Sequence, residues 1–159
     1  MANAKSRGAQ CAPVIIENIE IFVNQSEKQI AIHDIDEASA KAAWPAIAAA
    51  YPGFTADFCF RDTLAPIAFL KEIGAAEHEN CVIMRLLPKD FVDIPACDTG
   101  GVQGRVAEIA EFARTTLAAD PDAMPEIMVP RDDYLEMGAT LHVGFLRAGY
   151  FISYRVQNI

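Results

Sequence analysis

The chain of 159 residues has few of the residues and runs that mark common functional classes. It contains three histidines and one tryptophan, and its 13 basic side chains against 22 acidic ones give a formal net charge of −9. Because this balance opposes binding to a phosphate backbone, we expect no direct nucleic-acid partner. No apolar run approaches the roughly 18 residues that a membrane-spanning helix needs, so we expect no membrane partner either.

The cysteines and serines lack the spacings of familiar reactive sites. Cys11, Cys59, Cys81 and Cys97 are 48, 22 and 16 positions apart and form no C-x-x-C pair, so neither a zinc site nor redox chemistry is indicated. No serine lies in a G-x-S-x-G elbow, and the first 13 residues contain no apolar stretch of a secretory signal. We therefore expect a cytoplasmic protein with reduced thiols, no metal and no cofactor.

The composition is that of a folded chain. Hydrophobic residues make up 52% of the sequence and the mean hydropathy is +0.16, which is too apolar for a disordered protein. A chain of 17.3 kDa buries roughly 68–70% of its unfolded surface, enough for one hydrophobic core. The sequence predicts a flexible tail over residues 1–13 and a single α+β domain over residues 14–159.

The first half of the chain alternates between strand and helix patterns. Residues 14–23 and 28–35 show strand alternation, and the polar residues 24–27 between them predict a hairpin. Asp36 is a suitable N-cap for a helix that Pro45 should kink or divide. A short strand over 54–60 follows, and then a helix with an apolar stripe (Leu64, Ile67, Leu70 and Ile73) that ends at Gly74.

The second half contains the clearest predicted helix. The expected elements, in chain order, are a polar loop over 77–80, a central strand over 81–87, an irregular connection over 88–101, a helix over 102–117, a strand over 126–129, a helix over 134–137, and a hairpin of strands 141–146 and 150–156. This order predicts an α+β two-layer sandwich, in which a mostly antiparallel sheet has about three helices on one face. The terminal hairpins are expected near the sheet edges.

The charge is distributed unevenly along the chain. All 22 acidic residues lie between Glu17 and Glu136, a span that also holds nine basic residues and so carries −13. We therefore favour a non-catalytic protein-interaction module of inhibitor, immunity or anti-defence type that engages a basic protein surface. The residues expected to contact that partner are Asp90, Asp93, Asp98, Asp34 and Glu37. A homodimer through an exposed edge strand of the C-terminal hairpin is a further alternative.

A glycine-rich turn supports a different class of function. The segment from Thr99 to Arg105 enters the predicted helix over 102–117, where backbone N–H groups can approach an anion. It is neither a Walker loop nor a dinucleotide fingerprint. The alternative function is a small-molecule transferase or binder that holds a phosphate-bearing ligand such as an acyl-CoA. Its expected ligand-binding residues are Gly100, Gly101, Gln103, Gly104 and Arg105.

This turn resembles, over Gln103-Gly104-Arg105, the turn with which the GNAT acyltransferase superfamily holds a pantetheine pyrophosphate. The resemblance implies acyl-CoA binding. Two features depart from that superfamily: the glycine turn begins about a dozen residues after the strand, and no hairpin is predicted between the second helix and that strand. The chain is therefore not assigned to the superfamily on its sequence.

The remaining reactive side chains have ordinary structural interpretations. Strand alternation sends His33 and Asp34 to opposite faces, which disfavours a metal site with Asp36. His78 is expected in a solvated polar turn and His142 as a semi-buried strand residue. Cys97, beside Asp98 near a helix N-terminus, is the candidate thiol nucleophile, but no histidine partner can be assigned to it.

Overall fold

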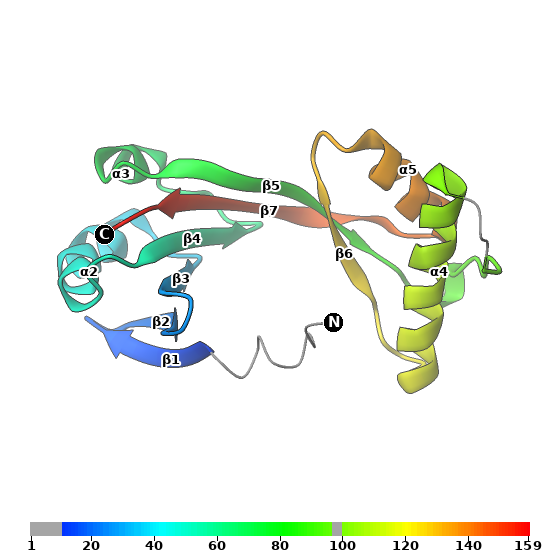
Figure 1. Ribbon diagram of the computed structural model, residues 1–159, viewed down its shortest axis with the longest axis horizontal. Helices are drawn as coiled ribbons and strands as arrows, with labels where there is room; N and C mark the ends of the chain where they lie inside the picture. Colours follow the sequence, from blue (N-terminus) through cyan, green and yellow to red (C-terminus); the bar gives the residue numbers. More distant parts are fainter. Residues whose placement is uncertain (1–10, 97–99) are drawn as a thin grey trace. The chain divides into compact units, whose positions relative to one another are not determined.

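The computed structural model describes residues 11–96 and 100–159, which form an α+β fold (Figure 1). Its strands are β1 (Cys11–Ile16), β2 (Ile19–Asn24), β3 (Gln29–His33), β4 (Thr55–Arg61), β5 (Ala76–Arg85), β6 (Glu126–Pro130) and β7 (Leu146–Val156). Its α-helices are α2 (Glu37–Ala50), α3 (Ile67–Glu72), α4 (Gly101–Ala119) and α5 (Tyr134–Val143), and η1 (Pro88–Asp90) is a 3-10 turn. The predicted fold class is confirmed, with four α-helices in the described residues where about three were expected.

The strands form one mixed, mostly antiparallel sheet in the order β1-β2-β3-β4-β7-β5-β6. The chain divides into two compact units: unit 1 is Met1–Glu79 with Ile152–Ile159, and unit 2 is Asn80–Phe151. The single domain over residues 14–159 stays a prediction. Most of the expected tail lies outside the described residues, and its last residues, 11–13, belong to β1. In the described parts of the chain, no helix is long and apolar enough to cross a membrane.

Unit 1 begins with two consecutive hairpins. The single strand predicted over 14–23 is wrong, because a turn at Glu17 and Asn18 separates β1 from β2. Both turn residues have positive φ angles, 49° and 64°, as a two-residue hairpin turn requires, and asparagine tolerates this conformation better than most residues. The predicted hairpin between β2 and β3 is confirmed, with Phe22 opposite Ala31.

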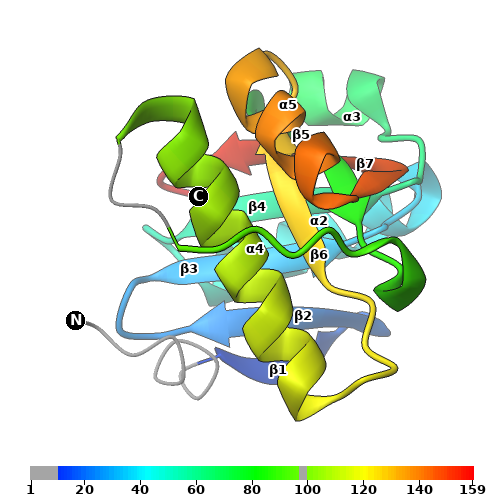
Figure 2. The same cartoon turned by 90° about the vertical axis from the view of Figure 1, so that its right-hand side faces the viewer.

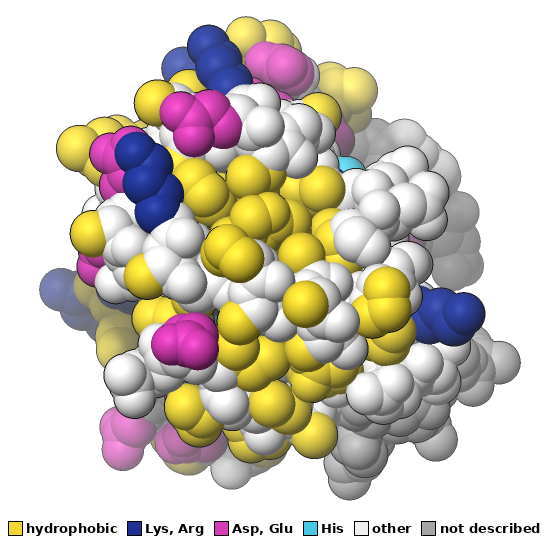
Figure 3. Space-filling view, turned by 90° about the vertical axis from the view of Figure 1, so that its left-hand side faces the viewer, with side chains coloured by type: hydrophobic (Ala, Val, Ile, Leu, Met, Phe, Trp, Pro, Cys, Tyr) yellow, Lys and Arg dark blue, Asp and Glu magenta, His cyan; other side chains and the backbone are white. Residues whose placement is uncertain are grey.

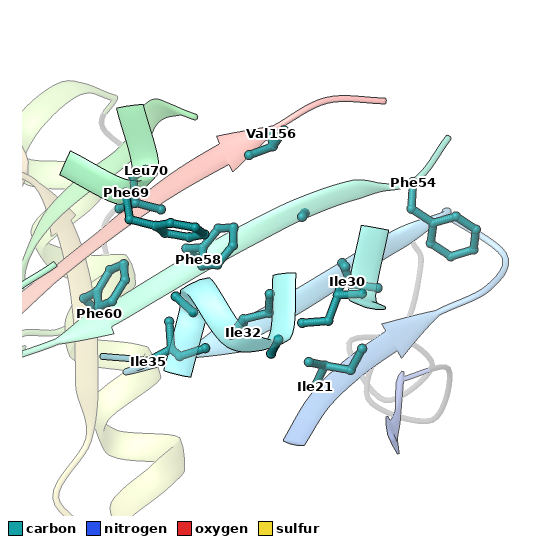
Figure 4. Close-up of a cluster of buried hydrophobic side chains, with 14 of the residues drawn as sticks. Ile21, Ile30, Ile32, Ile35, Phe54, Phe58, Phe60, Phe69, Leu70 and Val156 are labelled. Atoms are coloured by element: carbon teal, nitrogen blue, oxygen red, sulfur yellow. The ribbon is translucent and has the colours of Figure 1, made fainter. Parts of the chain in front are cut away.

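Helix α2 covers one face of the unit 1 strands. Asp36 is its N-cap as predicted, since the Asp36 carboxylate accepts a hydrogen bond of 2.8 Å from the Ser39 backbone N–H. Apolar side chains of α2 and α3 pack on Ile21, Ile30, Ile32 and Phe58 (Figure 4). The division predicted at Pro45 is wrong: α2 continues through it, because Ala43 and Ile47 on either side are buried in this core.

Helix α3 is shorter than predicted. It begins at Ile67, so Leu64 lies before the helix and is 95% exposed, whereas Leu70 is buried. The apolar stripe expected to be core is therefore only partly core. Figure 3, which views the end of unit 1 that carries α2 and α3, shows apolar side chains gathered across this face. Gly74 follows the helix with a φ of +78°, in the terminating role predicted for it.

The C-terminal hairpin predicted from residues 141–156 is wrong. Residues up to Val143 continue α5, Gly144 ends it with a φ of 109°, and β7 runs unbroken through Gly149. The reason is that Met137, Thr140 and Val143 are spaced three apart, so they share the buried face of a helix. Because β7 lies between β4 and β5, it is no edge strand for a homodimer.

The polar loop predicted over 77–80 is also wrong. These residues belong to β5, which begins at Ala76, and their side chains are exposed or half-buried along the strand. Polar composition indicated a loop, but backbone pairing in the sheet decides the structure here. The strands predicted over 54–60, 81–87 and 126–129 are confirmed as β4, β5 and β6.

Candidate functional site

Unit 2 is built around the long helix α4. The side chains of Val106, Ile109 and Ala113 lie on one face of α4 and are buried, as the apolar periodicity predicts. They pack with Val129 of β6 and Phe145, beside α5 (Figure 2). Strands β5 and β6 pair antiparallel beneath this layer. The beginning of α4 is thereby held on a rigid support.

The first turn of α4 presents backbone hydrogen-bond donors. Its N-cap is Gly100, which supplies no side-chain hydrogen bond, and no acidic residue lies in the first turn. The first N–H groups of a helix have no partner within the helix, and they carry the positive end of its dipole. Gly101 has a φ of +77°, a conformation that favours glycine at this entry. This turn is suited to an anionic ligand.

A cavity of about 470 Å³ opens beside this turn. It is lined by Ile94, Pro95, Ala96, Val102, Gln103, Val106, Gly138 and His142. The walls are mostly apolar, and the Gln103 amide and the His142 imidazole are their polar side-chain groups. A cavity of this size with a few convergent polar groups is typical of a small-molecule site.

The irregular connection after β5 supplies one wall of the cavity and is fastened to both helices. Arg114 of α4 donates hydrogen bonds of 3.0 and 2.6 Å to the Asp93 carboxylate and one of 2.9 Å to the Ile94 carbonyl. The Val92 N–H donates to the Val143 carbonyl at the end of α5, at 2.9 Å. Residues 94–96 of this connection lie in the cavity wall.

Arg105 does not face the cavity as a free cation. Its guanidinium donates to the Glu136 carboxylate of α5 at 2.8 and 2.9 Å and to Glu108 at 3.0 Å. The hydrogen bonds that Arg105 donates to Glu136 and then to Glu108 raise its pKa above the ordinary value, against the effect of burial. Arg105 therefore holds α4 and α5 together. Its predicted contact with a ligand remains untested.

The other predicted ligand residues divide by position. Gln103 lines the cavity, and Gly100 and Gly101 lie at the entry of α4. A side chain at Gly100 or Gly101 would meet no atom within 4 Å, so crowding does not explain either glycine. His142 was expected on a strand and instead lies in the last turn of α5. The sequence predicted a helix over 134–137 only. Because α5 continues to Val143, His142 reaches the cavity.

The acidic residues predicted to bind a partner are divided between the two units. Asp34 and Glu37 belong to unit 1, where Asp34 accepts a bond from the Arg61 N–H at 2.9 Å and Glu37 pairs with Lys41 at 3.0 Å. Asp90 and Asp93 belong to unit 2, where Asp93 pairs with Arg114. Asp98 lies outside the described residues. Three of these carboxylates therefore already have partners within the chain.

The structure describes three of the remaining candidates, Cys59, His33 and His78. Cys59 is buried, as predicted for a small apolar core residue, and burial raises the pKa of its thiol to about 12. Cys97 lies outside the described residues. His33 packs edge-on against Phe22, with ring centroids 5.6 Å apart, and His78 lies on β5. Over residues 11–96 and 100–159, no group of three metal-ligating side chains comes together.

Comparison with known proteins places this geometry in a familiar fold. No protein-family model matches the sequence, and no curated protein matches it significantly. The structure is similar to that of a GCN5-related N-acetyltransferase from Kribbella flavida, with a TM-score of 0.51 and 10% identity, over 96% of this chain and 92% of that chain. A likeness at this identity shows the fold, and the chain has a GNAT-like α+β fold.

This likeness corrects the preferred functional prediction. The interaction module of inhibitor, immunity or anti-defence type is wrong, because nearly the whole chain follows the fold of an N-acetyltransferase. The internal ion pairs of Asp93 and Glu37 point the same way. The alternative, a transferase for a phosphate-bearing ligand such as an acyl-CoA, agrees better with the fold. A basic protein partner and a cytoplasmic location stay predictions.

Proposed function

We propose that the protein is an acyl-CoA-dependent acyltransferase whose donor binds in unit 2. The observation that carries the proposal is the glycine entry of α4, which lies beside an apolar cavity in a chain with a GNAT-like fold. A CoA thioester has two chemically different parts, a polyanionic phosphate end and a long, weakly polar arm. The site offers a matching surface for each.

The phosphate end is assigned to the N–H groups of α4 before Arg105. An anion at a helix N-terminus is typically stabilised by about 0.3–1 kcal/mol at an exposed site. No acidic side chain lies in the first turn to repel it, and the cap residue Gly100 has no side chain that could occupy these N–H groups. Because Arg105 is bound by Glu136 and Glu108, the backbone carries most of this interaction.

The arm and the acyl group are assigned to the cavity. Val102, Val106 and Ile94 offer apolar walls, and apolar burial contributes about 25 cal/mol per Å² removed from water. The Gln103 amide has both a donor and an acceptor for an amide group of the arm. An apolar surrounding also keeps water from the thioester carbonyl.

The chemistry requires one group that accepts a proton. In acyl transfer to an amine, the amine nitrogen attacks the thioester carbonyl, the C–S bond breaks, and the leaving thiolate takes up a proton while the amine loses one. Among the described residues that line the cavity, His142 is the one whose side chain can accept a proton as a general base. We assign His142 as the general base, a role typically worth 10²–10⁴-fold in rate.

The test is a transfer assay with acetyl-CoA and a panel of primary amines, in which release of CoA and formation of the amide are both measured. The wild type should transfer acetyl to at least one amine. His142→Gln should lower kcat by about 10²-fold or more, whereas His78→Gln, an exposed histidine of β5 outside the cavity, should keep wild-type activity. Absence of acetyl-CoA binding would contradict the proposed function. Equal activity of the two variants would contradict the role of His142.

A further inference from the structure

A second cavity lies wholly within unit 1. Its volume is about 410 Å³, within the range of small-molecule sites. It is lined, among the described residues, by Cys11, Phe22, Asn24, Glu27, Gln29, Ile30, Ala31 and Asp57. Phe22, Ala31 and Asp57 are register partners on β2, β3 and β4, so the cavity floor is one face of the sheet. Nothing in the proposed acyl transfer uses it.

Asn24 presents a donor to this cavity. Asn24 is only 6% exposed. Its side-chain oxygen accepts hydrogen bonds from the Ser26 hydroxyl at 2.9 Å and from the Glu27 backbone N–H at 3.1 Å. Because the N–H of Glu27 can only donate, it fixes which end of the amide is oxygen. The Asn24 side-chain nitrogen makes no hydrogen bond to the described residues and is not among their buried unpaired polar atoms, so it is accessible at the cavity. A ligand acceptor would satisfy it.

The charge at this cavity favours a cation. Arg155 donates to both oxygens of the Asp57 carboxylate, at 2.7 and 2.9 Å, and largely neutralises it. The Glu27 carboxylate has no ion-pair partner among the described residues and leaves the lining with a net negative charge. The aromatic face of Phe22 also suits a cation, which is attracted to the electron-rich face of a ring.

We infer that unit 1 binds a small hydroxylated amine between Glu27 and Asn24. The ammonium group of the ligand pairs with Glu27 beside the ring of Phe22, and a hydroxyl oxygen of the ligand accepts from the Asn24 side-chain nitrogen. The side-chain amide of Gln29 has no hydrogen-bond partner among the described residues, and it contacts the remaining hydroxyl groups of the ligand. The inference does not rest on the proposed acyl transfer.

The experiment is an NMR titration of the full chain with glucosamine, with glucose as the neutral counterpart of similar size. Glucosamine should shift the side-chain amide signals of Asn24 and Gln29 in a saturable way, and glucose should bind at least fivefold more weakly. Equal responses to the two sugars, or shifts that avoid both amides, would overturn the inference.

A matched pair of variants tests the charge. Glu27→Gln should weaken glucosamine binding about fivefold, the upper range for an exposed ion pair, and leave glucose unaffected. Glu72→Gln removes the same charge from the surface of α3, outside the cavity, and should bind glucosamine as the wild type does. Unchanged binding in Glu27→Gln, whose exposed side chain is not needed for folding, would refute the assignment. Neither outcome depends on whether acetyl-CoA is used.

Discussion

Arg105 of α4 donates from its Nε atom to both carboxylate oxygens of Glu136 on α5, at 2.9 and 2.8 Å. The Glu136 side chain is only 15% exposed, whereas that of Arg105 is 43% exposed. This pair joins the two helices that form opposite walls of the unit 2 cavity. It also withdraws the nearest positive charge from the first turn of α4.

Glu136→Gln tests both consequences. Loss of the ion pair should lower the free energy of unfolding by about 1 kcal/mol, a value discounted because Arg105 is partly exposed. It should also raise the affinity for CoA, because Arg105 then keeps only Glu108 as a carboxylate partner and its positive charge is less neutralised. Urea unfolding and calorimetric titration measure the two effects. Glu108→Gln removes the more exposed partner and should change stability less; equal losses would contradict the assigned role of Glu136.

Gly144 should tolerate no side chain. Its φ is +109°, and a Cβ atom there would lie 2.1 Å from the backbone carbonyl oxygen of Asp90. Gly144→Ala should therefore lower the free energy of unfolding by about 2 kcal/mol or more, from backbone strain and overpacking together.

Two other glycines serve as controls for that variant. Gly53 also has a positive φ, but a Cβ atom there would meet nothing within 4 Å. Gly53→Ala should therefore lower the free energy of unfolding only through backbone strain, by about 1 kcal/mol. Gly138→Ala lies in α5 with open space around it and should stabilise the helix by up to about 1 kcal/mol. Thermal unfolding ranks the three. A Gly144→Ala protein as stable as Gly53→Ala would disprove the close approach to Asp90.

Cys59 should make stability fall at alkaline pH. Burial raises the pKa of its thiol from 9.0 to about 12, so the folded state holds the proton more tightly than the unfolded state does. The contribution is fully present below pH 9 and is lost as the pH rises from 9 to 12. Unfolding midpoints in urea across this range should fall less steeply for Cys59→Ala than for the wild type. Parallel curves would show that Cys59 does not titrate differently on folding.

Ser153→Ala should increase stability. The Ser153 hydroxyl is buried, with 2% of the residue exposed, and has no hydrogen-bond partner in the part of the chain that the structure describes. Removing an unsatisfied buried hydroxyl should raise the free energy of unfolding by about 1 kcal/mol. Ser39→Ala is the contrasting variant, because the Ser39 hydroxyl donates to Asp36 at 3.0 Å and its loss should not stabilise. A less stable Ser153→Ala protein would show that the hydroxyl has a partner.

Local signals predicted those parts of the fold that local interactions determine. The Asp36 cap, the terminating Gly74 and the buried stripe of α4 all follow from residues within a turn or two of one another. The same reasoning failed over residues 141–156. Alternating apolar residues there fit a strand, but Val143 also completes a helical stripe with Met137, and packing within unit 2 favours the helix.

The candidate site was predicted in part for the same reason. The glycine entry and Gln103 are local features of one helix, and the sequence reasoning identified them. The partnership of Arg105 with Glu136, 31 residues away, and the arrival of His142 at the cavity depend on how α5 packs against α4. No periodicity in the sequence carries that information. A spacing of three between Met137, Thr140 and Val143 was the one available signal for the longer α5.

The central claim is that the first turn of α4 and its cavity bind an acyl-CoA, and an NMR titration with CoA tests it most directly. The backbone amide signals of Val102, Gln103 and Gly104 should shift saturably, together with the imidazole of His142. Gly138→Leu, which places a side chain in the cavity wall, should abolish these shifts while the protein stays folded. A saturable response that leaves the first turn of α4 unperturbed would show that CoA binds elsewhere. No response to CoA at all would show that the protein does not bind it.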